Sequence, residues 1–412
     1  IAVRDNGDVT FNGATATSCL QLEAYGGSLK FNGGNIRAFS LNNGITCKDF
    51  LPENYCYYYY SIGSDLSRPI KLADVTNAIN AGNYVAVGAC EHQSAADGAC
   101  EYCGASIQAL VTTANNKTTG YATLEEAINA AKENSGSTVK LTGNVNHTGS
   151  SIEIEKGTFT IDLNGQTLSY DGLNLGMITN TLINLTGPAD VTIINSAETT
   201  AYAKIIGEDT HSMLKVSDEN AKLTIGQKDA ANKLNFRANT NDIWARSGSV
   251  VIYGGTFYSQ TYAVMNAVDR DVNVTIYDGD FTGPANAILA EKGTVNIKGG
   301  TFKHWNSTGY GLKISTNGQI SGGKFYGIDS GSTTLANRVA SGSTLKKEDG
   351  SWLTTKDLAK TTTEETVSVS TKPVEITGIK INGVSVVNDT ATAYVNETLR
   401  FSAETTTTDG VT

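Results

Sequence analysis

Four residues with metal-binding side chains lie close together in the segment CEHQSAADGACEYCG, residues 90–104. They have the spacing C-x-H-x7-C-x2-C and are Cys90, His92, Cys100 and Cys103. Thiolate and imidazole groups at this spacing can complete a tetrahedron around Zn²⁺, and Asp97-Gly98 supplies a turn between the two halves. Because all four ligands would come from the protein, we expect a closed, structural zinc site that holds together a segment too short for its own core.

A disulfide is the alternative for the same cysteines. Cys90 would pair with Cys100 or Cys103, an arrangement that an oxidising exterior favours. The other three cysteines lie in strand-like segments, where a buried cysteine commonly serves as a small apolar residue; they are Cys19, Cys47 and Cys56. A bridge between Cys47 and Cys56 stays open from the sequence alone.

Carboxylates are densest in a short segment of the second half of the chain. Its members are Asp269, Asp271, Asp278 and Asp280. If Asp271 faced Asp278 or Asp280 across a groove about 5 to 10 Å wide, the pair could act as the acid and the nucleophile or base of a glycosidase. The alternative is that they are solvated turn residues. The chain has no Asp-Asp pair and no Gly-His-Gly, which disfavours galacturonase and pectate-lyase chemistry.

Aromatic side chains could stack on sugar rings. Six candidates for such a ligand-binding face are Trp244, Tyr258, Tyr262, Tyr277, Trp305 and Tyr310. Packing within loops is the alternative use of the same residues. His147 and His211 have no second ligand near them in the sequence, so we expect them in loops outside any metal site.

The composition limits the partners of the chain. Of its 412 residues, 41 are Asp or Glu and 31 are Lys or Arg, which argues against nucleic acid or an anionic membrane, since both select clustered cations. No apolar run reaches the roughly 18 residues of a membrane span, and no secretory signal opens the chain. The sequence begins at Ile1 in the middle of a strand-like pattern, so we expect a piece of a longer protein whose polar surface suits export.

A strand, a turn with glycine and a phenylalanine recur in the second half of the chain. The stretches VVIYGGTF, VTIYDGDF, VNIKGGTF and GQISGGKF end at Phe257, Phe281, Phe302 and Phe325. The spacings are 24, 21 and 23 residues, and a period of this length indicates a solenoid, in which each coil buries its apolar face by stacking on the next. The glycine pairs at 254–255, 299–300 and 322–323 would supply the positive φ of a corner, with phenylalanine pointing inward.

The coils need a cap, because an open strand edge invites aggregation. From about residue 138 to 340 the pattern allows roughly nine or ten coils, or about 45 Å of stack at ~4.8 Å per coil. The segment YATLEEAINAA, residues 121–131, predicts a helix in which Thr123 and Glu126 form a capping box and apolar residues recur at helical spacing. We expect this helix to cover the first coil.

These elements together resemble a known group of proteins. YATLEEAINAA, STVKLTGNV, SIEIEKGTFTIDLNGQTL and the GGTF coils are similar to right-handed parallel β-helix modules of the pectate-lyase-like type, common in large surface proteins of anaerobic gut bacteria. The resemblance covers about residues 116–345 and implies an all-β solenoid with an N-terminal capping helix. It implies no single activity, because the fold hosts lyases, hydrolases, adhesins and stalks. It also points to zinc, since short C-x-H…C-x-x-C knuckles occur in such proteins.

The flanking segments suggest further domains. Residues 1–64 carry the same pattern in VTFNG and LKFNGG, so we expect the C-terminal coils of a preceding β-helix. Residues 65–115 would be a connector with the zinc knuckle, 116–345 the β-helix, and 346–372 a polar connector. Residues 373–412 alternate as strands do and resemble the start of a bacterial immunoglobulin-like domain.

The sequence as a whole favours a non-catalytic, structural and adhesive region of a large secreted or cell-surface protein. Its β-helix would present a face to glycans or to another cell. The alternative is a carbohydrate-active enzyme, a glycoside hydrolase or polysaccharide lyase, with carboxylates in the groove of the stack. We expect no nucleic-acid partner and no membrane-spanning segment in this region.

Overall fold

The computed structural model describes residues 2–4, 8–25, 28–41, 47–59, 68–81, 83, 85–171, 181–198, 202–207, 211–353, 358–371, 374–381, 384–385 and 401–407. Strands dominate these residues, and the α-helices among them are α1 (Leu72–Asn80) and α2 (Leu124–Lys132). Neither helix is long and apolar enough to cross a membrane. The chain divides into two compact units, one of residues 1–146, 157–169 and 193–199, the other of residues 147–156, 170–192 and 200–412.

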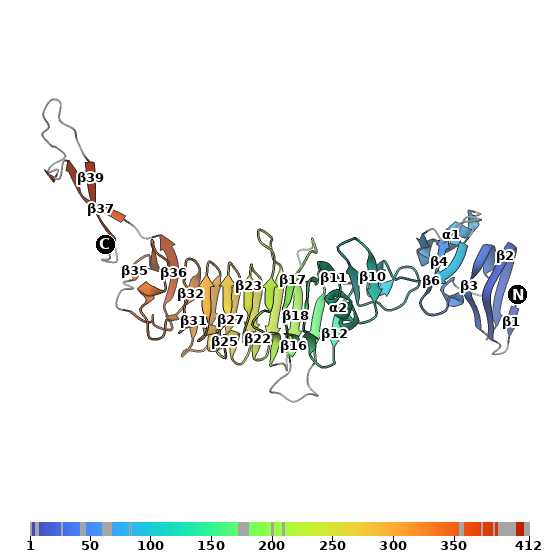
Figure 1. Cartoon of the computed structure of the whole chain (residues 1–412), viewed down its shortest axis with the longest axis horizontal. Helices are drawn as coiled ribbons and strands as arrows, with labels where there is room; N and C mark the ends of the chain where they lie inside the picture. Colours follow the sequence, from blue (N-terminus) through green and yellow to red (C-terminus); the bar gives the residue numbers. More distant parts are fainter. Residues whose placement is uncertain are drawn as a thin grey trace, which may run out of the picture. The chain divides into compact units, whose positions relative to one another are not determined.

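The strands belong in turn to three long sheets, so that every third strand along the chain lies in the same sheet (Figure 1). The eight-stranded sheet has the order β13 (Ile152–Ile154), β16 (Thr181–Leu185), β19 (Ser212–Val216), β22 (Asn241–Ala245), β25 (Ala263–Ala267), β28 (Asn286–Ala290), β31 (Tyr310–Ile314) and β33 (Ile328–Asp329). The nine-stranded sheet has the order β10 (Thr118–Tyr121), β9 (Ala109–Thr112), β11 (Ser137–Leu141), β14 (Gly157–Asp162), β17 (Ala189–Ile194), β20 (Lys222–Ile225), β23 (Ser249–Ile252), β26 (Asn273–Ile276) and β29 (Thr294–Ile297).

The eleven-stranded sheet completes each coil. Its order is β12 (Val145–His147), β15 (Thr167–Tyr170), β18 (Ala203–Gly207), β21 (Leu234–Ala238), β24 (Thr256–Ser259), β27 (Asp280–Gly283), β30 (Thr301–His304), β32 (Lys324–Tyr326), β36 (Thr366–Thr371), β34 (Ser343–Lys347) and β35 (Trp352–Leu353). Neighbours from β18 to β32 pair in parallel. Because every third strand returns to the same sheet, the described chain has an all-β, solenoid-like fold.

Phenylalanines form a continuous column in the second unit. Phe257, Phe281, Phe302 and Phe325 are fully buried, and the centroids of consecutive rings lie 4.7, 4.9 and 5.0 Å apart with nearly parallel planes. This spacing is that of neighbouring strands, about 4.8 Å, because the strand register places each phenylalanine opposite the next. The predicted stacking of these four residues is confirmed.

The corner before each phenylalanine uses glycine in two ways. Gly300 and Gly323 have φ of 99° and 108°, in the left-handed region that favours glycine, as predicted. The first glycine of each of these two pairs, Gly299 or Gly322, has no positive φ and instead allows close backbone approach, because a Cβ on Gly299 would collide with the carbonyl oxygen of Tyr277. The glycine pairs therefore set both the bend and the distance between coils.

A fifth ring extends the column beyond the predicted set. Phe236 lies 4.7 Å from Phe257, centroid to centroid. The glycine motif does not include it, because the corner before it is made by Asn232, with φ of 45°. Asparagine is one of the few other residues that tolerate this conformation.

Helix α2 begins as the sequence predicts. The Thr123 hydroxyl accepts a hydrogen bond from the N–H of Glu126, and the Glu126 carboxylate accepts one from the N–H of Thr123, both at 3.2 Å. Its buried residues are Leu124, Ala127, Ile128 and Ala131. The helix packs on β9, β11 and β14, and the antiparallel hairpin of β9 and β10 pairs with β11. The edge of β11 is thus covered rather than left open.

Antiparallel strands also close the far end of the stack. Strand β36 pairs with β32, which sets Val367 opposite Phe325, and Val367 is buried. The sequence predicts a polar connector over 346–372, whereas β35 and β36 lie in this range. The difference follows from the alternation T-V-S-V-S-T, which gives β36 one apolar face.

Residues after 372 form a small separate sheet within the described part of the chain. Its strands are β37 (Val374–Ile381), β38 (Val384–Ser385) and β39 (Phe401–Thr407), and β37 pairs antiparallel with both of the others. Most of the second predicted strand, 393–403, lies outside the described residues. The immunoglobulin-like assignment stays a prediction.

The N-terminal residues form a six-stranded sheet in the first unit. Strands β1 (Ala2–Arg4), β2 (Asp8–Tyr25) and β3 (Ser28–Leu41) pair in parallel, and Phe11 stacks on Phe31 with centroids 5.1 Å apart. Antiparallel strands β6 (Val85–Ala89), β4 (Tyr55–Tyr59) and β5 (Pro69–Ile70) follow. The predicted coils end at residue 64, whereas this sheet continues to Ala89; the predicted domain limits stay predictions.

One carboxyl group is buried in the stack without a partner. Asp242, in β22, is 0% exposed, and neither of its carboxylate oxygens makes a hydrogen bond. By strand register, Met213 and Val264 hold the same position on the neighbouring strands. Burial raises the pKa of Asp242 well above its usual range, and the nearby backbone of Tyr258 and Ala238 offsets this only in part.

Replacing this carboxyl is expected to stabilise the fold at neutral pH. Because the folded-state pKa is raised, the unfolded chain releases the Asp242 proton above about pH 4 while the folded chain keeps it, so stability falls by up to about 1.4 kcal/mol per pH unit up to the folded-state pKa. Urea unfolding of Asp242→Val and wild type at pH 4, 5.5 and 7 measures this. The advantage of Asp242→Val should grow with pH, and Asp242→Asn should show the same loss of pH dependence. A difference that is constant with pH would contradict the assignment.

Candidate metal centre

Two local structures bring the predicted metal ligands together. The N–H of Cys90 donates to the carbonyl of Asn54 at 2.7 Å, which ties the first half of the site to the start of β4. In the second half, β7 (Ala95–Ala96) and β8 (Ala99–Cys100) form a hairpin. Its turn residues Asp97 and Gly98 have φ of 50° and 77°, and Asp-Gly is a preferred pair for two positive φ values. The predicted turn is confirmed.

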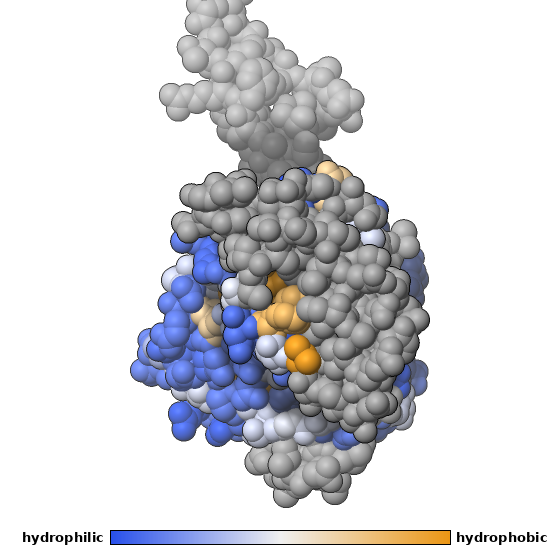
Figure 2. Space-filling model, turned by 90° about the vertical axis from the view of Figure 1, so that its right-hand side faces the viewer, coloured by the Kyte–Doolittle hydropathy of each residue, from blue (hydrophilic) through white to orange (hydrophobic). Residues whose placement is uncertain are grey.

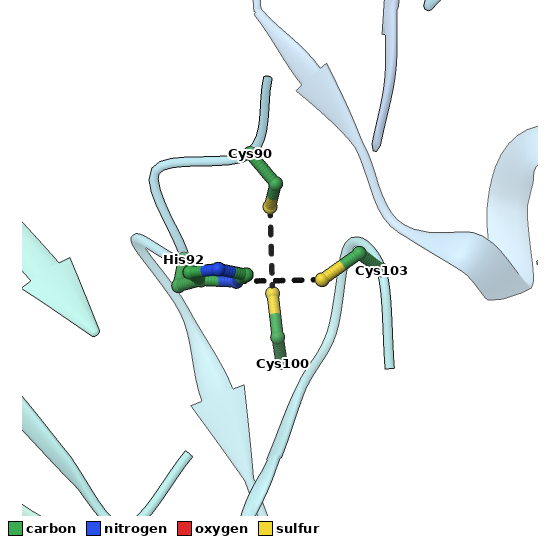
Figure 3. Close-up of side chains that lie close together, drawn as sticks. All are labelled: Cys90, His92, Cys100 and Cys103. Atoms are coloured by element: carbon green, nitrogen blue, oxygen red, sulfur yellow. Dashed lines mark hydrogen bonds between the residues drawn. The ribbon is translucent and has the colours of Figure 1, made fainter. Parts of the chain in front are cut away.

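The four side chains point toward a common centre (Figure 3). The ligand atoms of Cys90, His92, Cys100 and Cys103 all lie within 4.8 Å of one another. Cys90 Sγ is 3.7 Å from Cys100 Sγ, and Cys103 Sγ is 3.3 Å from His92 Nδ1. Metal–sulfur bonds of about 2.3 Å in a tetrahedron place two sulfurs about 3.8 Å apart, whereas a disulfide requires about 2.05 Å. The cysteines form no disulfide, and the cluster could hold a metal ion.

Electrostatics explains why this cluster suits a cation. Hydrogen bonds from the thiols of Cys103 and Cys90 lower the pKa of Cys100. Hydrogen bonding to Cys100 is the largest cause that raises the pKa of both Cys90 and Cys103. An ionised Cys100 therefore makes the thiols of Cys90 and Cys103 harder to ionise. A bound cation would offset this repulsion by stabilising all three thiolates.

The surroundings of the cluster fix its ligands. The three cysteines are at most 9% exposed, and the N–H of Tyr102 donates to Cys100 Sγ at 3.4 Å. Glu101 forms an ion pair with Lys71 at 2.6 Å and accepts a hydrogen bond from the hydroxyl of Ser94; hydrogen bonding to Lys71 is the main cause that lowers the pKa of Glu101. Four protein ligands in a buried cluster match a structural rather than a catalytic metal site.

The structure separates the three candidate catalytic aspartates. Asp278 and Asp280 line one pocket of about 150 Å³ with Tyr202 and Tyr253. Asp271 lines two other cavities, of about 540 and 490 Å³, at the opposite end of β26. The predicted pairing of Asp271 with Asp278 or Asp280 in one groove therefore does not occur in the described pockets. Asp269 instead accepts hydrogen bonds from Trp244 Nε1 at 3.0 Å and Arg246 Nε at 2.9 Å.

The six candidate aromatic residues lie at different places on the stack. Trp244 is in the eight-stranded sheet, with Lys215 Nζ 4.5 Å from its ring centroid. Tyr258 is in the eleven-stranded sheet, with Arg237 over its ring at 5.5 Å. Tyr262 and Trp305 lie in the segments that lead from the eleven-stranded to the eight-stranded sheet. Tyr310 is the first residue of β31 in the eight-stranded sheet, and Tyr277 directly follows β26. They do not form one cluster.

Exposed aromatic rings stand out on a polar surface. The described surface visible in Figure 2 is mostly hydrophilic, with small hydrophobic areas. Trp305 is 57% exposed, Tyr262 40% and Tyr277 38%. Two further tyrosines are not among the six predicted aromatic residues. Tyr202 is 46% exposed, and Tyr253 stacks on Tyr277 with centroids 4.8 Å apart. Tyr253 could have been found from the repeat, because I-Y-G-G and I-Y-D-G place both tyrosines at the same corner.

The remaining histidines and cysteines lie outside the metal cluster. His147 is the last residue of β12, not a loop residue as predicted, and its Nε2 lies 2.7 Å from the carbonyl oxygen of Ser150. The ring of His211, which precedes β19, packs on Trp244 with centroids 4.6 Å apart. Cys47 lies in the core of the N-terminal sheet, whereas Cys56 packs with the metal-site cysteines, and no disulfide joins the two. The side chain of Cys19 lies outside the described residues.

Comparison with known proteins gives no match. No protein-family model, no curated protein and no solved structure matches this chain. The fold and the candidate sites described above therefore rest on the geometry of the chain itself.

Removing one ligand is expected to abolish tight metal binding. Cys100→Ser should weaken zinc binding by more than about a hundredfold, since even outer-shell changes cost 10- to 100-fold. Zinc content after dialysis and competition with a chelator measure this, with Cys47→Ala as a control that removes a buried cysteine outside the cluster. A wild-type chain that binds no zinc and contains a Cys90–Cys100 or Cys90–Cys103 disulfide by mass spectrometry would contradict the metal site.

Proposed function

We propose that this chain is a structural and adhesive, non-catalytic region of a large secreted or cell-surface bacterial protein. Its long parallel sheets form a right-handed parallel β-helix of the pectate-lyase-like type, which displays a glycan-binding surface. Zn²⁺ at Cys90, His92, Cys100 and Cys103 stabilises the segment between the N-terminal sheet and the stack. The resemblance to surface proteins of gut anaerobes supports the extracellular setting.

This proposal rests on the regular stacking of coils at the corner that carries Tyr253 and Tyr277, which we call the tyrosine corner. Tyr253 and Tyr277 stack with an angle of 18° between their rings, and Lys298 Nζ lies 4.7 Å from the ring centroid of Tyr277. The corner is held by the fully buried Phe257 and Phe281 directly after it. A rigid support of this kind lowers the entropy cost of ordering these side chains on binding.

The pocket beside this corner supports a sugar ligand. It combines the tyrosines Tyr202 and Tyr253 with bare backbone at Gly254 and Gly255 and with the acceptors Asp278 and Asp280. An aromatic wall with convergent polar groups fits the apolar face and the hydroxyls of one sugar ring. The carboxylates disfavour an anionic sugar, so we propose a neutral or amino sugar as the ligand.

A carbohydrate-active enzyme is the second candidate, and one observation favours it. Asp278 and Asp280 line the same pocket, as the two carboxylates of a glycosidase must. Asp278 already accepts a hydrogen bond from the N–H of Gly279 at 2.9 Å, which supports a turn-forming role for this residue. We therefore favour display over catalysis.

Glycan binding is expected to depend on the tyrosine corner. On a glycan array, Tyr253→Ala should weaken binding by about fivefold, because an aromatic contact contributes about 1 kcal/mol. Tyr262→Ala is the matched control, since this tyrosine is exposed but lies outside the pocket.

The same ligands distinguish display from catalysis. Bound glycans incubated with the chain should be recovered intact by chromatography. Cleavage products that disappear in the Asp278→Asn/Asp280→Asn variant would replace the adhesive assignment with a hydrolase or lyase. Equal binding of wild type and Tyr253→Ala would remove the pocket from the proposal.

A further inference from the structure

A fifth potential metal ligand is buried against the candidate metal centre. Cys56, in β4, is 0% exposed and belongs to the same apolar cluster as Cys90, Cys100 and Cys103. Its thiol is not among the four groups that converge on the common centre. In sequence Cys56 lies 34 positions before Cys90, so the ligand motif gives no sign of it.

The register of two antiparallel strands explains why Cys56 faces the site. Strand β4 pairs with β6 so that Cys56 lies opposite Gly88, and the carbonyl of Asn54 binds the N–H of Cys90. Cys56 and Cys90 are therefore diagonal neighbours on one face of the ribbon, within reach of each other. Because Gly88 has no side chain, nothing on the opposite strand stands between them. Cys56 accordingly packs in the same buried cluster as Cys90, Cys100 and Cys103.

Of the four candidate ligands, His92 is the one that borders a cavity in the described part of the chain. The three cysteines are at most 9% exposed, whereas His92 borders a cavity of about 740 Å³, which is also lined by Ile107, Tyr121 and Glu126. We infer that the imidazole of His92 could turn toward this cavity if it left the metal. The cysteines have no comparable space beside them in the described pockets.

We propose that Cys56 is a reserve ligand, which replaces His92 and converts the site from three thiolates and one imidazole to four thiolates. The metal–nitrogen bond breaks and a metal–sulfur bond forms, while the proton of the Cys56 thiol passes to the released imidazole or to water. No electron is transferred. The four-thiolate form favours thiophilic ions such as Zn²⁺ and Cd²⁺. This inference rests on the proposed metal site.

The exchange also gives the site a mechanical role. Cys56 belongs to the six-stranded sheet, whereas Cys100 and Cys103 belong to the hairpin and the loop after it. A metal ion bound by Cys56 would therefore join the sheet to the knuckle through a metal–sulfur bond, in addition to the Cys90 hydrogen bond.

Metal substitution in the full chain tests the proposal. With Co²⁺ as the probe, His92→Ala should retain tetrahedral binding, and its sulfur-to-cobalt charge-transfer absorption should be about a third stronger than in wild type, since a fourth thiolate adds a transition. Its affinity should stay within about tenfold of wild type, whereas His92→Ala/Cys56→Ser should bind more than about a hundredfold more weakly than His92→Ala. His92→Ala/Cys47→Ala is the matched control and should bind like His92→Ala.

A second measurement leaves Cys56 unchanged, so that it does not depend on whether the Cys56→Ser variant folds. The ¹¹³Cd NMR signal of the His92→Ala chain should move to the range of four sulfur ligands. A signal typical of three sulfurs and an oxygen, or equal affinity with and without Cys56, would overturn the reserve-ligand proposal while the metal site stands. A wild-type chain that binds neither Co²⁺ nor Cd²⁺ would overturn the metal site itself.

Discussion

Stacking of coil on coil, with backbone pairing to backbone and ring lying on ring, is the constraint on which the rest of this structure depends. A single coil of some twenty residues has too little apolar surface to fold alone. In the stack, Phe236 to Phe325 share one column at the strand spacing, so each coil completes the core of its neighbours. This also explains the glycines: a side chain at Gly299 would push two coils apart.

A stack of this kind needs closed ends, and the chain closes them with antiparallel strands. The β9–β10 hairpin covers β11, and β36 covers β32. The N-terminal sheet uses the same solution, since β6 pairs antiparallel with the parallel pair of β2 and β3. Residues 90–104 have few large apolar side chains. A metal ion bound by the Cys/His cluster would add cohesion to this segment.

The sequence predicts what depends on local pattern. The phenylalanine period, the capping box of Thr123 and Glu126, and the turn at Asp97-Gly98 are visible because each requires particular residue types at fixed spacing. The four metal ligands are found for the same reason. Strand β36 is missed because its short T-V-S-V-S-T alternation directly follows the polar residues 360–365, and its pairing with β32 and β34 depends on long-range register.

Long-range register is what the sequence conceals. Cys56 packs against the candidate metal centre only because β4 pairs with β6 in one particular register. Asp271 and Asp278 appear close in sequence, yet β26 carries them to opposite ends of a strand. The burial of Asp242 also cannot be predicted from the sequence, because an aspartate in the stretch N-D-I-W-A would be expected to face solvent.

Distances between spin labels along one row of the stack test the central claim most directly. Glu153, Lys215 and Lys313 occupy one row of the eight-stranded sheet, which passes through Asn184, Trp244, Asn266 and Leu289. With genetically encoded labels, electron spin resonance should give about 29 Å between positions 153 and 313, six coils apart, and about 19 Å between 215 and 313, four coils apart, at ~4.8 Å per coil. Broad distributions, or distances that do not follow the number of coils, would contradict the stack and every site placed on it.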